Sequence, residues 1–245
     1  MNKIDPVVSV VTATFNSEKT LPRLIKSLKD QTCKDFKWVV ADGGSKDGTL
    51  DLLAEASSVL PIDVSSGPDF GIYDALNNAL ARVDTPYYLT MGSDDWLFSN
   101  AIGDYSRAAA VSGADIVSAC VKKSDGGMLV PNAGHRRKNG HLAYVSQHAV
   151  GALIKRSLHD RVGMYSRHYP VAADRYFLLK AIEHQGCSLC FESFQAGVYA
   201  IDGTSGVRLF DTYLDVYKVD YALSSHPKWT AFYSWLRYGA GLRHF

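Results

Sequence analysis

The first hundred residues alternate between apolar, β-branched runs and segments whose apolar residues recur at helical spacing. Val7 to Ala13 is a run of the first kind, of the length expected for a strand buried on both faces. The range 21–28 then has helical spacing. Further strands are predicted at 36–41, 62–64, 87–91 and 115–121, and further helices at 49–56, 72–83 and 101–111. This alternation predicts an α/β fold with a mostly parallel sheet wrapped by helices.

The second half of the chain is less regular. Residues 124–150 are rich in Gly and Asn and carry a basic run at 135–138, so we expect a long mobile loop. Helices are predicted at 153–158 and 176–182, strand at 189–200, and an aromatic helical tail from Phe210 onward. No internal repeat and no obvious linker divides the chain.

Length and charge narrow the class of protein. The 245 residues fit one α/β domain or a domain with a smaller appendage, and a net charge of +1 gives no overall field to attract nucleic acid. Four cysteines are too few for a disulfide scaffold, and the sequence shows neither a signal peptide nor about 20 consecutive apolar residues. We therefore expect a cytoplasmic protein without a nucleic-acid partner.

Polar sequences follow three of the predicted strands. They are Thr12 to Asn16, Asp42 to Gly44, and Ser93 to Asp95. In a parallel sheet, ligands bind outside the carboxyl ends of the strands, where such loops meet. The sequence therefore predicts one crevice lined by these three loops.

Asp94 and Asp95 are adjacent carboxylates at the end of an apolar strand. Such groups repel each other unless a cation or a hydrogen-bonding partner lies between them. Mg²⁺ or Mn²⁺ prefers oxygen ligands and is often shared between carboxylates and substrate phosphates. The alternative is a solvated turn that caps the next helix, since Asp is also a good N-cap.

Two further segments carry polar residues beside glycines. Asp42 can accept a hydrogen bond from the N–H of a nucleotide base, and the glycines after it allow close approach of the backbone; the alternative is a tight turn that caps the following helix. Downstream, Asp74 and Asn77 lie three residues apart and share a helix face. Their alternative is the polar outer face of an amphipathic helix.

Four ordered motifs together resemble family 2 glycosyltransferases, which are inverting enzymes of the GT-A fold. The motifs are Thr12 to Asn16, Asp42 to Thr49, Asp69 to Asn77, and Ser93 to Trp96. The similarity continues to about residue 205. It implies a glycosyltransferase of the hexosyl type, related to enzymes that build bacterial polysaccharides, with a GT-A domain at 1–209 and a helical tail at 210–245. Within the domain, residues 1–100 would bind the nucleotide and residues 101–209 the acceptor.

The resemblance also implies roles for individual residues. Contacts to the nucleotide sugar would come from Thr12, Thr14, Asn16, Asp42, Asp69, Asp74, Asn77 and Asp94. The family's DxD motif is Ser93-Asp94-Asp95 here, so Asp95 would be the ligand of Mg²⁺ or Mn²⁺. Asp174 matches the position of the family's catalytic carboxylate and would act as the base that deprotonates the acceptor hydroxyl; the alternative is a helix N-cap.

Other candidate contacts are less specific. His148 could touch the diphosphate, the metal or the acceptor, or it could be a packed histidine. Arg136 and Arg137 could close over phosphates, because guanidinium groups pair phosphate oxygens; the alternative is a solvated loop. The aromatic and basic tail, with Trp229 and Trp235, suits a membrane interface, core packing or a dimer contact.

The expected partners are a nucleotide-diphosphate sugar and a glycan or polyprenyl-linked acceptor, with peripheral membrane contact or a homo-oligomer as further hypotheses. Two other functions share parts of the pattern: a sugar-nucleotide-binding protein without transfer, and a sugar nucleotidyltransferase. The sequence after the first strand, Thr12 to Asn16, disfavours the nucleotidyltransferase, which usually has a Gly-rich basic loop there. Neither GxGxxG nor GxxxxGK occurs, which disfavours a dehydrogenase and a P-loop ATPase.

Overall fold

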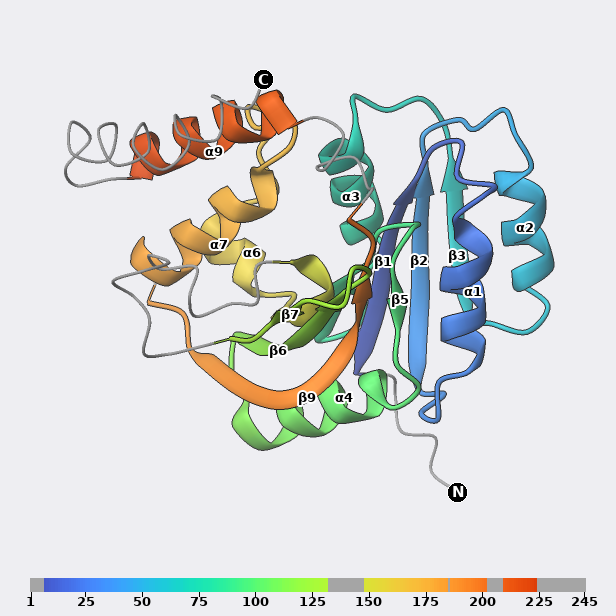
Figure 1. Ribbon diagram of the computed structural model, residues 1–245, viewed down its shortest axis with the longest axis horizontal. Helices are drawn as coiled ribbons and strands as arrows, with labels where there is room; N and C mark the ends of the chain where they lie inside the picture. Colours follow the sequence, from blue (N-terminus) through green and yellow to red (C-terminus); the bar gives the residue numbers. More distant parts are fainter. Residues whose placement is uncertain (1–6, 132–147, 185, 202–208, 224–245) are drawn as a thin grey trace.

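A curled β-sheet with helices on both faces forms the centre of the molecule (Figure 1). The computed structural model describes residues 7–131, 148–184, 186–201 and 209–223. The strands are β1 (Val8–Thr14), β2 (Phe36–Asp42), β3 (Ile62–Ser66), β4 (Tyr87–Thr90), β5 (Trp96–Leu97), β6 (Ile116–Lys123), β7 (Met128–Leu129), β8 (Ala152–Lys155) and β9 (Leu189–Tyr199). The helices are α1 (Leu21–Lys29), α2 (Thr49–Ala56), α3 (Ile72–Leu80), α4 (Ala101–Ser112), α6 (Leu158–Val162), α7 (Ala173–His184), α9 (Leu209–Leu223) and a short 3₁₀ turn, η2 (Ala149–Gly151).

The described strands form one sheet in the order β3-β2-β1-β4-β8-β6-β9-β5, with β7 paired to β6. Strands β3, β2, β1 and β4 are parallel. Their register places Thr14 opposite Asp42 and Asp42 opposite Ser66, so the polar ends of these strands lie side by side. Strand β8 continues the sheet by antiparallel pairing to β4 and β6.

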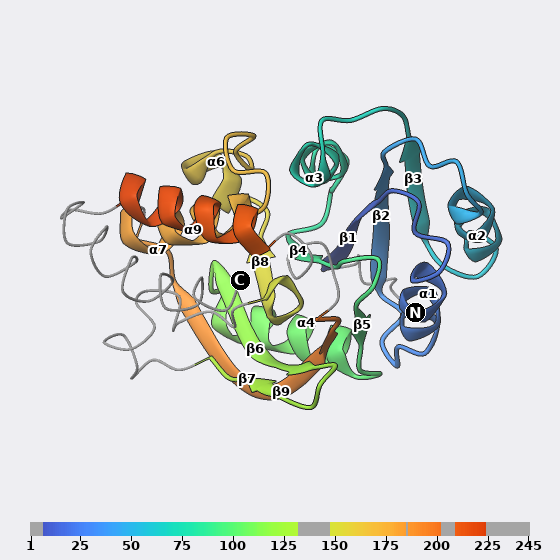
Figure 2. The same ribbon diagram turned by 45° about the horizontal axis from the view of Figure 1, so that its top comes forward.

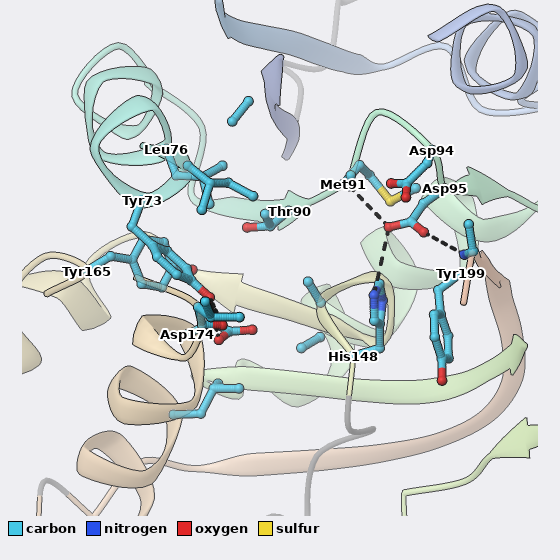
Figure 3. Close-up of a pocket in the computed structure, with 18 of the residues that line it drawn as sticks. Tyr73, Leu76, Thr90, Met91, Asp94, Asp95, His148, Tyr165, Asp174 and Tyr199 are labelled. Carbon is cyan, nitrogen blue, oxygen red and sulfur yellow. Dashed lines mark hydrogen bonds and ion pairs between the residues drawn. The ribbon is translucent and has the colours of Figure 1, made fainter. Parts of the chain in front are cut away.

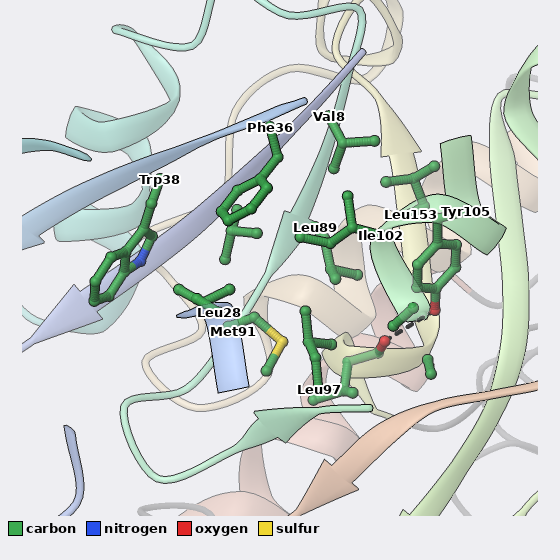
Figure 4. Packing of buried hydrophobic residues seen from close by; sticks show 14 of the residues in the cluster. Val8, Leu28, Phe36, Trp38, Leu89, Met91, Leu97, Ile102, Tyr105 and Leu153 are labelled. Atoms are coloured by element: carbon green, nitrogen blue, oxygen red, sulfur yellow. Dashed lines mark hydrogen bonds between the residues drawn. The ribbon is translucent and has the colours of Figure 1, made fainter. Parts of the chain in front are cut away.

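Each face of the sheet buries its own apolar cluster. The first cluster lies under α1, α2 and α4 and includes Trp38, Leu89 and Tyr105 (Figure 4). The second lies under α3, α6 and α7 and includes Tyr88 and Phe177. Successive residues of a strand point to opposite faces, so Tyr88 and Leu89 of β4 belong to different clusters.

The predicted α/β class is confirmed, and the strands and helices predicted within residues 7–121 are present, with shifts of a few residues at some ends. One helix prediction is wrong. Residues 153–158 were expected to be helical, but 152–155 form strand β8, and a helix begins only at Leu158. A short apolar run has the same appearance in a buried strand and in a buried helix. Pairing of β8 between β4 and β6 decides the matter here.

The described part of the C-terminal tail packs on the domain that precedes it. Helix α9 lies along α7 (Figure 2), where Val219 is fully buried with Ala172 and Leu179. Arg175 of α7 forms an ion pair with Asp220, at 2.7 Å. The aromatic residues Trp229 and Trp235 lie outside the described residues. Among the helices that are described, none is long and apolar enough to cross a bilayer.

Candidate active site

A cavity of about 400 Å³ opens beyond the carboxyl end of β4, between α3, α7 and the segment at 199–201. Its volume suits a small-molecule ligand. Carboxylates lie at both ends of the cavity (Figure 3). The acidic pair Asp94 and Asp95 lies at one end beside His148, and Asp174 lies at the other end beside Tyr73.

The backbone holds Asp95 at the end of β4. One carboxylate oxygen, Oδ1, accepts a hydrogen bond from the Ala200 N–H at 3.0 Å, and Oδ2 accepts one from the Gly92 N–H at 3.2 Å. Gly92 leaves the space for both carboxylates. A Cβ atom at that position would lie 2.6 Å from Asp94 Oδ1 and 2.8 Å from Asp95 Oδ2.

The two carboxylates are electrostatically unfavourable as anions. Burial raises the pKa of Asp95 to about 6, although the hydrogen bonds from Ala200 and Gly92 favour its ionised form. Burial and the neighbouring charge of Asp95 also raise the pKa of Asp94. A cation between them would remove both penalties. Among the described residues, no group of three or more His, Cys, Asp or Glu side chains is arranged so that it could hold a metal ion. Mg²⁺ is commonly shared between one or two carboxylates and substrate phosphates.

His148 forms the wall next to the acidic pair. Its ring stacks on Tyr199 with centroids 4.2 Å apart, and its Nδ1 accepts a hydrogen bond from the Val150 N–H. Burial lowers the pKa of His148 to about 4, so the ring is neutral at pH 7. Since Nδ1 accepts, the proton is on Nε2, which lies 4.0 Å from Asp95 Oδ2. The ring therefore presents an N–H donor beside the acidic pair.

Asp174 lies in the first turn of α7 and is held through one of its oxygens. Its Oδ1 accepts hydrogen bonds from the Tyr73 hydroxyl and from the Arg175 N–H, both at 2.7 Å. Within the described residues, Oδ2 has no hydrogen-bond partner. Burial and the charge of Asp174 raise the pKa of Tyr73 well above its usual value, so the phenol remains a donor. This arrangement leaves Oδ2 available to accept a proton in the cavity.

Asp42 is enclosed by donors from β1, β3 and the loop after β2. Oδ1 accepts hydrogen bonds from the hydroxyls of Thr14 and Ser45, and Oδ2 accepts from Ser66 and from the N–H groups of Gly44 and Ser45. Burial opposes its ionisation, but these hydrogen bonds outweigh it and lower the pKa of Asp42. Asp42 is not part of the cavity wall, and its visible contacts organise the loop after β2.

The residues predicted at the carboxyl end of β1 and in the loop after it are likewise bound to neighbours. Thr12 is fully buried and accepts a hydrogen bond from Trp38 Nε1 at 3.0 Å. Thr14 donates to Asp42. Asn16 has a positive φ of 48° and accepts from the Lys46 N–H at 2.9 Å. None of these side chains lines the cavity, and their predicted contacts with a nucleotide remain predictions.

The Asp69 carboxylate lies against Gly43 in the loop after β2. A Cβ atom on Gly43 would lie 2.7 Å from Asp69 Oδ2 and 3.3 Å from the ring of Phe15. Both neighbours therefore approach this glycine closely. Phe15 is 64% exposed, which is unusual for a large aromatic side chain. This corner combines a closely approached glycine, a carboxylate and an accessible aromatic ring.

Asp74 and Asn77 of α3 both contact the segment at 165–167. Asp74 is buried and forms an ion pair with Arg167, while its Oδ2 accepts a hydrogen bond from the Phe70 N–H. Asn77 donates to the Tyr165 carbonyl at 2.9 Å and accepts from the Tyr165 N–H at 3.0 Å. Neither side chain lines the cavity. Contact with the sugar, predicted for both, remains a prediction.

Several cavity residues were not predicted from the sequence. Tyr73 belongs to the motif at 69–77, yet it points to Asp174 from 101 positions away. Tyr199 stacks on His148, and Thr90 and Tyr165 line the wall between the two carboxylate ends. The sequence places Tyr73 next to Asp74 within one motif, but nothing in that local pattern indicates that the Tyr73 hydroxyl contacts Asp174. Arg136 and Arg137 lie outside the described residues.

This arrangement defines an α/β protein with a ligand cavity at the carboxyl end of its parallel strands and acidic groups at both ends of that cavity. The family model for Glycosyl transferase family 2 matches residues 9–184. The match covers more than half of the chain, and the chain therefore belongs to this family. It is a glycosyltransferase.

Curated relatives agree with this family. The PGL/p-HBAD biosynthesis glycosyltransferase of Mycobacterium bovis is 27% identical over 189 residues, which are 73% of this chain and 71% of the relative. The cholesterol galactosyltransferase of Borreliella burgdorferi is 30% identical over 111 residues, which are 45% of this chain and 31% of the relative. These relatives differ in the substrates that their names give.

Solved structures share the GT-A fold. S. aureus TarS 1-349, in complex with UDP-GlcNAc, has a TM-score of 0.72 at 22% identity; the match covers 88% of this chain and 65% of that one. The mannosyltransferase PcManGT from Pyrobaculum calidifontis, in complex with GDP-Man and Mn²⁺, has a TM-score of 0.66 at 18% identity. This match covers 97% of this chain and 76% of the mannosyltransferase. The chain thus spans just under two thirds of TarS 1-349.

Proposed function

We propose that this glycosyltransferase moves a sugar from a nucleotide-diphosphate sugar to an acceptor hydroxyl with inversion at the anomeric carbon. The proposal rests on the placement of acidic groups at the two ends of the cavity: Asp94 and Asp95 lie at one end and Asp174 lies at the other. A diphosphate at the acidic pair and an acceptor at Asp174 would lie on opposite sides of the sugar. That placement is what an inverting displacement requires.

The acidic pair would hold Mg²⁺ or Mn²⁺, with Asp95 as the main ligand and Asp94 as a second ligand or a ribose contact. Supporting this, burial raises the pKa values of both carboxylates, so both gain from a cation. When bound, the metal would neutralise charge on the departing diphosphate. His148 would add its Nε2–H as a donor to the same phosphate oxygens.

Asp174 would act as the base. The Tyr73 hydroxyl and the Arg175 N–H occupy Oδ1, and we propose that Oδ2 takes the proton of the acceptor hydroxyl as that oxygen attacks. Because the carboxylate lies in the first turn of α7, it is carried by a rigid element and favoured by the helix dipole.

The nucleoside would lie over the loops after β1 and β2. Phe15 offers an exposed ring on which a base can stack, and Asp69 and Gly43 lie against it. Thr12, Thr14, Asn16 and Asp42 would shape this corner from below through the hydrogen bonds described above. Asp74 and Asn77 would act by joining the donor half to the acceptor half.

The acceptor would enter beside Asp174, where the wall also includes Ile72, Val171 and Leu178. These apolar side chains are compatible with a glycan carried on a polyprenyl or other lipid. Such an acceptor is consistent with a role in polysaccharide assembly at the cytoplasmic face of a membrane, with the tail as a peripheral contact. We also propose the division at residue 209, since α9 begins there as a separate layer on α7.

Two variants test the proposal against a binding protein that performs no transfer. Asp174→Asn should retain nucleotide-sugar binding and lose transfer by about 10²- to 10⁴-fold. Asp95→Ala should lose Mn²⁺-dependent binding. A panel of UDP and GDP sugars, screened by thermal shift with and without Mn²⁺, would identify the donor. Undiminished turnover in Asp174→Asn would rule out the base, and absence of binding by every donor would contradict the function.

A further inference from the structure

A chain of hydrogen bonds runs from the interior to the wall of the cavity. Tyr88 on β4 lies 2.8 Å from His159 Nε2 and 3.0 Å from the hydroxyl of Tyr165. On the other side of the imidazole, His159 Nδ1 lies 3.0 Å from the Gly163 carbonyl oxygen. All three side chains are buried, with at most 4% of each exposed.

The direction of this chain is set by the carbonyl of Gly163. A carbonyl oxygen can only accept, so His159 Nδ1 carries the proton. Burial lowers the pKa of His159 to about 4, so the ring is neutral and its Nε2 must accept. The Tyr88 hydroxyl therefore donates its one proton to His159. The oxygen of Tyr88 must in turn accept the proton of Tyr165.

Tyr165 is thereby left with an oxygen that can only accept. Burial raises the pKa of Tyr165 to about 12, so the phenol does not ionise near neutral pH. The Thr90 hydroxyl lies next to this phenol and interacts with it, which partly offsets the effect of burial on the pKa of Tyr165. Thr90 Oγ1 is nevertheless buried and makes no hydrogen bond of normal geometry with any described residue. Both residues line the cavity.

These two side chains lie where the transferred sugar would be. In Figure 3, Thr90 occupies the wall between Asp174 at one end and Asp94 and Asp95 at the other. If the diphosphate binds at the acidic pair and the acceptor at Asp174, the sugar ring spans the space beside Thr90. A buried hydroxyl without a partner is costly unless a ligand completes it.

We propose that Thr90 and Tyr165 form a subsite that recognises one hydroxyl group of the transferred sugar, an inference that rests on the proposed function. The sugar hydroxyl donates to the Tyr165 oxygen and accepts from the Thr90 hydroxyl. A hydroxyl can do both at once, whereas a hydrogen atom can do neither and a fluorine atom cannot donate. The subsite therefore selects a donor sugar with a free hydroxyl at one ring position.

The test uses Thr90→Val and Tyr165→Phe, which each remove one hydroxyl and keep the shape of the side chain. Tyr87→Phe is the matched control, because its phenol donates to the Ala114 carbonyl outside the cavity. Dissociation constants are measured for the nucleotide sugar found in the donor screen, for its deoxy and deoxyfluoro analogues at each ring position, and for the nucleoside diphosphate alone.

Both subsite variants should weaken binding of the parent sugar by about five- to tenfold, with the nucleoside diphosphate unchanged within twofold. For the deoxy analogue at one ring position, the variants and wild type should bind alike. The fluoro analogue at that position should bind as weakly as the deoxy analogue. Tyr87→Phe should bind every ligand as wild type does.

Equal effects of the variants on the parent sugar and on all deoxy analogues would overturn the subsite, as would a fluoro analogue that binds like the parent. Weakened binding of the nucleoside diphosphate alone would also overturn it, because the defect would then be general. Failure of the proposed function gives a different result: no nucleotide sugar binds to the wild-type protein. That result would overturn the subsite as well, because the subsite rests on the proposed function.

Discussion

Removing the Tyr73 hydroxyl should weaken catalysis without weakening donor binding. In Tyr73→Phe the ring keeps its place, because it is 9% exposed and packs against Tyr165 with centroids 5.6 Å apart. What is lost is the O–H donor to Asp174 Oδ1 at 2.7 Å, which also lies within hydrogen-bond distance of the Val171 carbonyl oxygen, at 3.1 Å. Oδ1 then keeps only the hydrogen bond from the Arg175 N–H, so the carboxylate is held less firmly and can rotate away from the acceptor hydroxyl.

A hydrogen bond to a charged group contributes about 1.5–3 kcal/mol, equivalent to roughly 10- to 150-fold in rate. The Arg175 N–H still holds Oδ1 at 2.7 Å, so we expect the lower part of this range. The predicted result is a fall in kcat of about 10- to 30-fold. The dissociation constant of the donor should change less than twofold, since the phenol does not approach the acidic pair.

Steady-state transfer assays and donor titrations on four proteins separate positioning from a structural defect. They are wild type, Tyr73→Phe, Asp174→Asn and the double variant. If Tyr73 acts through Asp174, the double variant should transfer as slowly as Asp174→Asn alone, because the effects of residues that act as a unit are not additive. Tyr87→Phe serves as the control for loss of a buried phenol. A kcat of Tyr73→Phe within twofold of wild type would refute the reasoning, and so would fully multiplicative losses.

Two further predictions concern the cavity and the buried histidine. Gly92→Ala should lose Mn²⁺-dependent donor binding by about tenfold or more while the protein still folds, because its Cβ would displace Asp94 and Asp95; wild-type affinity in titrations would contradict the packing. The pKa of His159 is 6.5 in the unfolded chain and about 4 in the folded chain, so the unfolded chain takes up a proton first as the pH falls. The contribution of the neutral, buried His159 to stability is therefore lost as the pH falls from 6.5 to about 4. Between pH 7 and 4.5, urea unfolding should show wild type losing roughly 2–3 kcal/mol more than His159→Gln, and parallel pH profiles would contradict this.

The sequence was sufficient to predict the parallel half of the fold. Strands β1 and β2 are short runs rich in buried residues, and each is followed by apolar residues at helical spacing, so local pattern and tertiary environment agree. The polar sequences after those strands also identified the acidic pair, because strand ends of a parallel sheet meet at one edge. At residues 153–158 the apolar run was too short to distinguish the spacing of a strand from that of a helix. The pairing of β8 with β4 and β6 decided the structure there.

Within the site, the sequence determined which side chains are available, and the tertiary structure decided which atoms remain free. The motif at 69–77 supplied Tyr73, Asp74 and Asn77 together. Only the packing of α3 against the segment at 165–174 directed Tyr73 to Asp174 and turned the other two toward Arg167 and Tyr165. Such contacts join residues about a hundred positions apart, so no local periodicity encodes them. The direction of the Tyr165 hydroxyl depends on a carbonyl and a histidine tautomer that exist only in the folded chain.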